Sequence, residues 1–184
     1  MKLRPILLSL LLSTATLGAA QLGGVTLADS MDTGGGKLLL NGMAVRKKVI
    51  FKVYVAGLYL PAREASGEAI LAGDTPRACV LHFVRKVEGG KVAGAWRDGL
   101  AANTPDASAE LKQQFATLCG WMEEMRDGEL LEFIYLPGRG TEVRVKGKSK
   151  GILPGKPFAD ALFACWIGPR PGPGEGFKRG LLGK

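Results

Sequence analysis

The chain has 184 residues, a formal net charge of +8 at pH 7, one histidine and three cysteines. A single histidine excludes a metal site built from several imidazoles, and three widely spaced cysteines exclude a scaffold held by many disulfides. The excess of basic residues favours anionic ligands or anionic surfaces as partners.

The first 20 residues have the pattern of a secretory signal peptide. Lys2 and Arg4 supply its positive charge, residues 6–12 its apolar segment, and small residues ending at Ala20 its cleavage site. We expect cleavage near Ala20, a periplasmic or secreted protein, and one mature domain over residues 21–184, whose formal charge falls from +8 to +6 with the two cations removed. Because no later apolar run reaches the roughly 20 residues of a membrane span, we expect no transmembrane segment in the mature protein. It also lacks a recognisable nucleic-acid-binding motif, so we expect no nucleic-acid partner.

The densest β signal follows a short predicted strand over residues 21–27 and lies in residues 40–60, which read LNGMAVRKKVIFKVYVAGLYL. From residue 51 on, both alternating sets of side chains are largely apolar, so we predict one central strand that is covered on both faces. Arg46 and three lysines interrupt this apolar pattern. Because desolvating a cation is costly, an inward-facing Arg46 implies an anionic partner. The β-branched and aromatic residues that carry the signal are Val45, Val49, Ile50, Phe51, Val53, Tyr54, Val55 and Tyr59.

The remaining elements follow from the spacing of apolar residues and from turn residues. Strands show an apolar period of two and helices a period of about 3.6, and clusters of Gly and Pro mark the connections between them. We predict helical turns over residues 66–71, a strand over 77–86, helices over 91–103 and from 106, a β-hairpin of residues 129–136 and 141–146, a helix over 156–167, and an irregular Pro/Gly stretch over 169–176.

This order of elements predicts an α+β fold. Strands, two consecutive helices, a hairpin and a final helix are typical of a mainly antiparallel sheet with helices packed on one face. A buried polar group in such a fold is best placed in a ligand cleft between the sheet and the helices.

Residues 40–60, together with LHFVRKV, the hairpin around LPGRGT and the closing ALFACWIGP, resemble the bacterial chalcone isomerase-like family over nearly all of the mature chain. The family takes its name from plant enzymes that close a chalcone to a flavanone. The resemblance implies a sheet with helices on one face and a ligand cleft between them. Its most specific motif here is the Val-Arg turn into an aromatic strand that ends in Gly-Leu-Tyr-Leu.

The resemblance implies a site around Arg46 and Tyr54. In the plant cyclases an arginine at the position resembling Arg46 binds the phenolate and the developing enolate, and a threonine stands at the position resembling Tyr54. In plant fatty-acid-binding relatives, an Arg and a Tyr at these places hold a carboxylate. A guanidinium and a phenol suit that ligand, because the first grips it in bidentate fashion and the second adds a neutral donor. The separation of eight residues is even, so both side chains face one cleft if the strand has no bulge, and we expect Lys52 at the rim of this site.

We therefore favour an exported, non-catalytic protein that binds a hydrophobic carboxylate such as a fatty acid and needs no cofactor. The alternative is an isomerase or intramolecular lyase for a chalcone- or enone-like substrate, with Arg46 stabilising an oxyanion and Tyr54 donating a proton. The cyclases place a Tyr, a Lys and an Asn on the helix after the second strand, whereas residues 91–99 contain neither Tyr nor Asn. Losing one such donor commonly costs about 100-fold in rate, which argues against ring closure.

The histidine and the cysteines are predicted to be structural. His82 lies between Val80 and Val84 on one face of its predicted strand, so we expect a hydrogen-bonded core residue. Its alternative role is an axial ligand to haem, with an arginine for a propionate. Cys79, Cys119 and Cys165 have apolar neighbours, which predicts buried thiols. Their odd number allows at most one internal disulfide. The identity of the ligand and the oligomeric state stay open.

Overall fold

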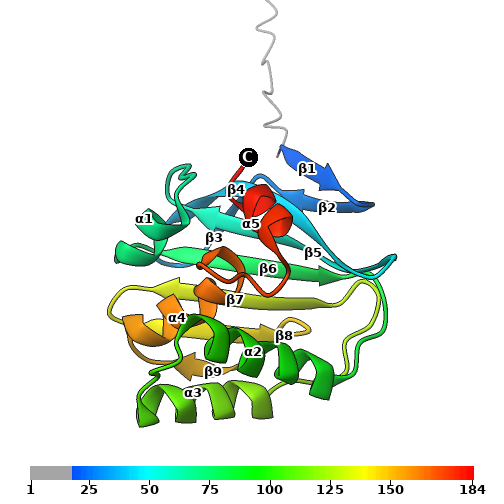
Figure 1. Ribbon diagram of the computed structural model, residues 1–184. Helices are drawn as coiled ribbons and strands as arrows, with labels where there is room; N and C mark the ends of the chain where they lie inside the picture. Colours follow the sequence, from blue (N-terminus) through cyan, green and yellow to red (C-terminus); the bar gives the residue numbers. More distant parts are fainter. Residues whose placement is uncertain (1–17) are drawn as a thin grey trace, which may run out of the picture.

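The computed structural model describes residues 18–184 and shows an antiparallel sheet of seven strands with helices packed on it (Figure 1). The sheet order is β3-β4-β5-β6-β7-β8-β9, so each strand pairs with its neighbours in the sequence, and a separate hairpin, β1–β2, precedes it. The strands are β1 (Ala19–Leu22), β2 (Val25–Ala28), β3 (Ser30–Asp32), β4 (Lys37–Lys48), β5 (Phe51–Leu60), β6 (Arg77–Phe83), β7 (Leu130–Leu136), β8 (Gly140–Val145) and β9 (Lys148–Leu153). The helices are α1 (Gly67–Ala72), α2 (Gly89–Asn103), α3 (Ala109–Gly120), α4 (Lys156–Ile167) and α5 (Glu175–Leu181).

The predicted α+β class, with helices on one face of the sheet, is confirmed. The main core lies between that face and the helices, and it includes Phe133 and Trp166. A second, smaller core lies on the other face, where Val25 and Leu27 of the β1–β2 hairpin pack with Val55. Both faces of the central strands are therefore covered. None of the helices within residues 18–184 is long and apolar enough to cross a membrane.

Capping residues set the helix starts. The Ser66 side chain accepts a hydrogen bond from the Ala69 backbone N–H at 3.1 Å, and Ser108 caps α3 in the same way through the Leu111 N–H. Pro157 stands in the first turn of α4, where the backbone N–H it lacks would be unpaired in any case. Helices α1, α2 and α4 agree with the predicted segments within a few residues.

The predicted single strand over residues 40–60 is wrong. It is a hairpin, in which β4 and β5 pair antiparallel and Val49 and Ile50 form the turn between them. The turn is hard to read from sequence because it contains no glycine. Of its two residues, Val49 has a φ of 57°, a left-handed conformation that β-branched residues rarely adopt.

Three further expectations needed correction. The first predicted strand is also a hairpin, because Gly23 and Gly24 adopt positive φ and turn the chain between β1 and β2. Strand β9 was not predicted, since its composition is polar and its pairing with β8 forms it. Helix α5 begins at Glu175, within the stretch predicted to be irregular.

Helix α5 packs closely against β4. A Cβ on Gly42 would lie 2.3 Å from the carbonyl oxygen of Gly180, so only glycine allows this approach. The contact buries Phe177 and Leu181 in the main core. The chain after α4 therefore folds back and packs α5 against β4 of the sheet (Figure 1).

The predicted signal peptide lies largely outside the described residues, which begin at residue 18. Its last two predicted residues belong to β1, where Ala19 pairs with Ala28 and Ala20 with Leu27. The expected cleavage point near Ala20 therefore falls inside a strand.

Candidate functional site

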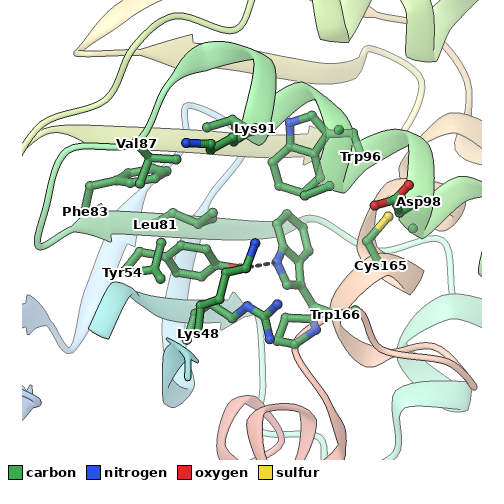
Figure 2. Close-up of a pocket in the computed structure, with 18 of the residues that line it drawn as sticks. Lys48, Tyr54, Leu81, Phe83, Val87, Lys91, Trp96, Asp98, Cys165 and Trp166 are labelled. Atoms are coloured by element: carbon green, nitrogen blue, oxygen red, sulfur yellow. Dashed lines mark hydrogen bonds between the residues drawn. The ribbon is translucent and has the colours of Figure 1, made fainter. Parts of the chain in front are cut away.

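A cavity of about 870 Å³ opens between strands β4–β6 and helices α2 and α4. Leu81 and Phe83 of β6 line its sheet side, while Trp96 of α2 and Trp166 of α4 line its helix side. Figure 2 shows these side chains and Tyr54 around one space. Its volume lies within the range of about 300–1,000 Å³ that is usual for small-molecule sites. The cleft predicted between sheet and helices is therefore present.

Arg46 and Tyr54 both line this cavity. They lie on neighbouring strands and not on one strand, because Arg46 of β4 is directly opposite Tyr54 of β5. Opposite residues of an antiparallel pair project to the same face. The two side chains are thus brought together as predicted, but by cross-strand pairing and not by an even spacing along one strand.

Tyr54 presents a neutral hydroxyl with its hydrogen available. The Trp166 indole Nε1 donates to the Tyr54 oxygen at 3.4 Å, and the rings of Phe83 and Phe177 lie 5.6 and 5.9 Å from the tyrosine ring. Burial raises the pKa of Tyr54 well above its ordinary value, and the Trp166 hydrogen bond and the charge of Arg46 offset only part of that effect. Since the indole N–H donates this bond, the Tyr54 O–H remains able to donate to a ligand acceptor.

Arg46 carries a half-buried charge without an acidic neighbour bonded to it. Within residues 18–184, no carboxylate forms an ion pair with its guanidinium. Acidic lining residues neutralise only part of the positive charge of the lining, because Glu88 pairs with Lys91 at 3.2 Å and Asp98 is the one other acid among the described lining residues. The cavity therefore has an excess of positive charge. Its basic lining residues are Arg46, Lys48, Arg85, Lys86 and Lys91, and its acidic ones are Glu88 and Asp98.

Lys52 does not line the cavity. Its side chain is exposed, and its ammonium donates to the Gly23 carbonyl at 3.2 Å, in the turn of the β1–β2 hairpin. The hairpin geometry explains this difference, because the register shifts after Arg46 and pairs Lys52 with Lys47. Lys52 is therefore not a residue of the cavity site.

His82 lies on the opposite face of β6 from the cavity. Its neighbours Leu81 and Phe83 line the cavity, whereas His82 is paired with Val55, whose side chain belongs to the second core. Successive side chains of a strand point to opposite faces. Haem ligation through His82 would therefore need a site other than this cavity.

The sequence model that describes chalcone isomerase-like proteins matches residues 19–183. The chain belongs to the chalcone isomerase-like family. The resemblance seen in its motifs is thereby confirmed. Comparison with curated protein sequences gives no match.

The fold is also found among solved structures. The crystal structure of a fatty-acid binding protein from Arabidopsis thaliana superposes with a TM-score of 0.71, over 90% of this chain and 96% of that chain. The two sequences are 16% identical. At that level the likeness establishes the chalcone isomerase-like fold.

Helix α2 of this chalcone isomerase-like chain departs from the cyclase pattern as its sequence predicted. It contributes Lys91 and Trp96 to the cavity, but neither a tyrosine nor an asparagine. Asn103, near the end of α2, is used elsewhere. Its amide donates to the carbonyls of Gly99 at 3.1 Å and Arg170 at 2.9 Å.

Two residues of α4 belong to the site without having been predicted there. Trp166 supplies the hydrogen bond to Tyr54, and Cys165 lines the cavity. The available signal was the apolar run of α4, which is typical of a helix buried on all sides, where an indole N–H needs a partner. Burial raises the pKa of Cys165 to about 12, so it is a neutral thiol at pH 7. All three cysteines are free: Cys79 and Cys165 are buried as predicted, and Cys119 is half-buried.

Proposed function

We propose that this protein is exported, that it binds a long-chain fatty acid, or a hydrophobic carboxylate of similar shape, in the cavity, and that it holds this ligand without catalysis. The carboxylate accepts hydrogen bonds from the Arg46 guanidinium and the Tyr54 hydroxyl, and the tail lies against the apolar walls. One observation carries the proposal. Arg46 and Tyr54 share the wall of an apolar cavity, and no carboxylate of the described chain pairs with that arginine.

The energetics favour an amphiphile over a small anion. A hydrogen bond to a charged group contributes about 1.5–3 kcal/mol, which offsets only part of the cost of association. Each buried methylene of a tail adds about 0.8 kcal/mol. The name of the Arabidopsis protein of the same fold, a fatty-acid binding protein, supports this ligand class.

The chemistry of the cavity supports binding over turnover. Raised pKa values keep Tyr54 and Cys165 neutral at pH 7, so the cavity offers neither a phenolate nor a thiolate. Helix α2 lacks the tyrosine and asparagine that the cyclases use. Ring closure needs several positioned donors, and this cavity presents fewer of them.

Titration with oleate tests the head-group assignment. Arg46→Ala should weaken oleate binding by about ten- to hundredfold, because it removes charge-assisted hydrogen bonds. Arg63→Ala is the matched control, since Arg63 is exposed and lies outside the cavity lining. Oleate binding by Arg46→Ala that equals wild type would show that the carboxylate is held elsewhere.

A series of saturated fatty acids tests the tail assignment. Affinity should rise about fourfold for each added methylene until the tail fills the cavity. Mass spectrometry of lipid extracted from the purified protein should recover the natural ligand. An affinity independent of chain length would contradict burial of the tail.

Chalcone absorbance tests the enzyme alternative. We expect no accelerated loss of the chalcone band with purified protein. Rapid loss that disappears in Arg46→Ala would establish an isomerase and overturn the non-catalytic assignment.

Export is tested on the protein from the periplasmic or secreted fraction. Its N-terminus, read by mass spectrometry, should lie near Gln21. Recovery of the uncleaved chain in the cytosol would contradict export.

A further inference from the structure

The tip of the β4–β5 hairpin exposes three consecutive apolar side chains. The exposed fractions are 88% for Val49, 80% for Ile50 and 55% for Phe51. Leaving such side chains in water is unfavourable, and their grouping at the end of a projecting hairpin marks an interaction surface. We call residues 47–52 the hairpin tip.

Cations surround these apolar residues, and residues 46–52 contain no acidic side chain. The Arg85 guanidinium lies over the Phe51 ring at 4.5 Å and brings the end of β6 against the tip. Two acidic side chains near this end are paired with other cations, Glu124 with Lys86 at 2.9 Å and Glu88 with Lys91. The cations beside the apolar tip are Arg46, Lys47, Lys48, Lys52 and Arg85.

The hairpin tip is also the rim of the cavity. Lys48, Val49 and Phe51 belong both to the tip and to the cavity lining. A surface that receives the tip therefore meets the cavity opening.

We infer that the hairpin tip docks into the surface of an anionic membrane, with its apolar residues among the acyl chains and its cations at the lipid phosphates. An apolar group edged by Lys and Arg matches the layers of such an interface. Three side chains at a narrow turn are too small an area for a stable protein interface, which buries more than about 1,000 Å². Docking places the cavity opening against the lipid. That it serves the exchange of a fatty acid rests on the proposed function, whereas the docking itself does not.

Vesicle co-sedimentation tests the docking, with purified protein whose N-terminus has been read by mass spectrometry. We expect binding to vesicles of phosphatidylglycerol and phosphatidylcholine that weakens in 0.5 M salt, because salt screens the charges. Ile50→Asn should bind these vesicles at least tenfold more weakly, since it removes an exposed apolar side chain that the docking places among the acyl chains. The matched control is Ile152→Asn, at a residue 40% exposed on β9. Lys47→Glu should also weaken binding about tenfold, and Lys148→Glu at the β8–β9 turn should not.

Oleate titration in solution separates the two proposals. Ile50 does not line the cavity, so Ile50→Asn should bind oleate as wild type does. Loss of vesicle binding with intact oleate binding supports the docking. Equal vesicle binding by Ile50→Asn and wild type overturns it, and so does an equal loss in Ile152→Asn. A dimer in solution that Ile50→Asn dissociates would show that the tip contacts a second copy and would also overturn it. Failure of wild type to bind oleate would count against the proposed function alone.

Discussion

The sheet carries two Arg–Tyr pairs, one near each end of β6. Arg77 is directly opposite Tyr135, and Arg46 is directly opposite Tyr54; both pairs face the helices. At the Arg77 end, the fold supplies the anions. Asp160 forms an ion pair with the buried Arg77, and the Tyr135 hydroxyl donates to Asp74 at 2.5 Å.

At the Arg46 end, the cavity occupies the positions that the two carboxylates take at the Arg77 end. The described chain provides no carboxylate bonded to Arg46, and Tyr54 accepts a hydrogen bond only from Trp166. The same two residue types therefore serve two purposes. Where carboxylates belong to the chain, the pair stabilises the fold, and where they are missing, the pair can receive the carboxylate of a ligand. The comparison predicts that changes at the first pair alter stability and changes at the second alter affinity.

The largest expected effect is at the Arg77 end. Asp160→Asn should lower the free energy of unfolding by about 3–5 kcal/mol, because it leaves a fully buried guanidinium without its counter-charge. Urea unfolding measures this change. The control is Glu142→Gln, which removes the partner of Arg144, a cation whose side chain is 38% exposed, and should cost less than about 1 kcal/mol. Equal losses in the two variants would show that the buried pair has no special role.

The next largest effect should be a loss of stability at alkaline pH, which again originates at the Arg77 end. Burial and the hydrogen bond to Asp74 raise the pKa of Tyr135 to about 12. The unfolded tyrosine releases its proton near pH 10, whereas the folded Tyr135 keeps it. The contribution of Tyr135 to the free energy of unfolding is therefore complete below pH 10 and is lost as the pH rises through 12. A pKa difference of two corresponds to about 3 kcal/mol, and because Asp74 is exposed to solvent we expect about 2 kcal/mol.

Urea unfolding at several pH values from 9 to 12 checks this expectation. The pKa values of Tyr54 and Tyr59 are also raised by burial, so they add a decline of the same sign. Tyr135→Phe should make the decline shallower without removing it. An unchanged decline in that variant would exclude Tyr135 as a contributor.

At the cavity, Tyr54→Phe should weaken oleate binding by roughly 1.5–3 kcal/mol, since it removes one donor to a charged group. Its ring contacts with Phe83 and Phe177 remain, so the loss of stability should not exceed about 1–3 kcal/mol, the cost of leaving the Trp166 indole N–H without its acceptor. Tyr54→Thr should lose the same affinity and also some stability through the cavity it leaves. We expect no chalcone turnover in Tyr54→Thr, because α2 still lacks the cyclase donors.

Tyr135→Phe is the mirror control for this prediction. It should reduce stability at pH 7 and leave the oleate affinity of the folded protein unchanged. A loss of affinity in Tyr135→Phe equal to that in Tyr54→Phe would remove the distinction between the two pairs.

The smallest expected effect concerns the hairpin tip, beside the Arg46 pair. Val49→Gly should raise the free energy of unfolding by up to about 1 kcal/mol, because glycine adopts a φ of 57° without strain. It should also weaken vesicle binding through the lost apolar side chain. The β8–β9 turn already has Gly147 at a φ of 74°, so Gly147→Val should destabilise the fold. A Val49→Gly variant less stable than wild type would show that the valine makes contacts that outweigh its strain.

The spacing of apolar and turn residues predicted most of the helices and strands. The remaining elements form because of strand pairing, which the spacing does not show. The helix over Lys156–Ile167 was predicted to its ends, because its apolar run lies between Pro/Gly punctuation. The turn at Val49 and the strand β9 were missed, since neither has the composition typical of its structure. In both, the pairing of a whole hairpin overrides local preference.

The candidate site was predictable only in part. Arg46 and Tyr54 were found through a family motif, although the geometry that unites them differs from the expected one. Trp166 lies 112 residues from the tyrosine it bonds, and Asp160 lies 83 residues from Arg77. No local spacing connects residues so far apart. Which of the two arginines has a carboxylate partner within the described chain can therefore be known only from the folded structure.

The glycine contact between α5 and β4 also bears on the order in which the protein is made. Phe177 of α5 packs edge-on against the ring of Tyr54, and residues 175–181 follow every strand of the sheet in the sequence. During synthesis, the sheet is therefore available before α5 packs against Tyr54. Under the proposed function, we expect loading with fatty acid to follow release of the chain, because Tyr54 gains this aromatic neighbour only when α5 has docked.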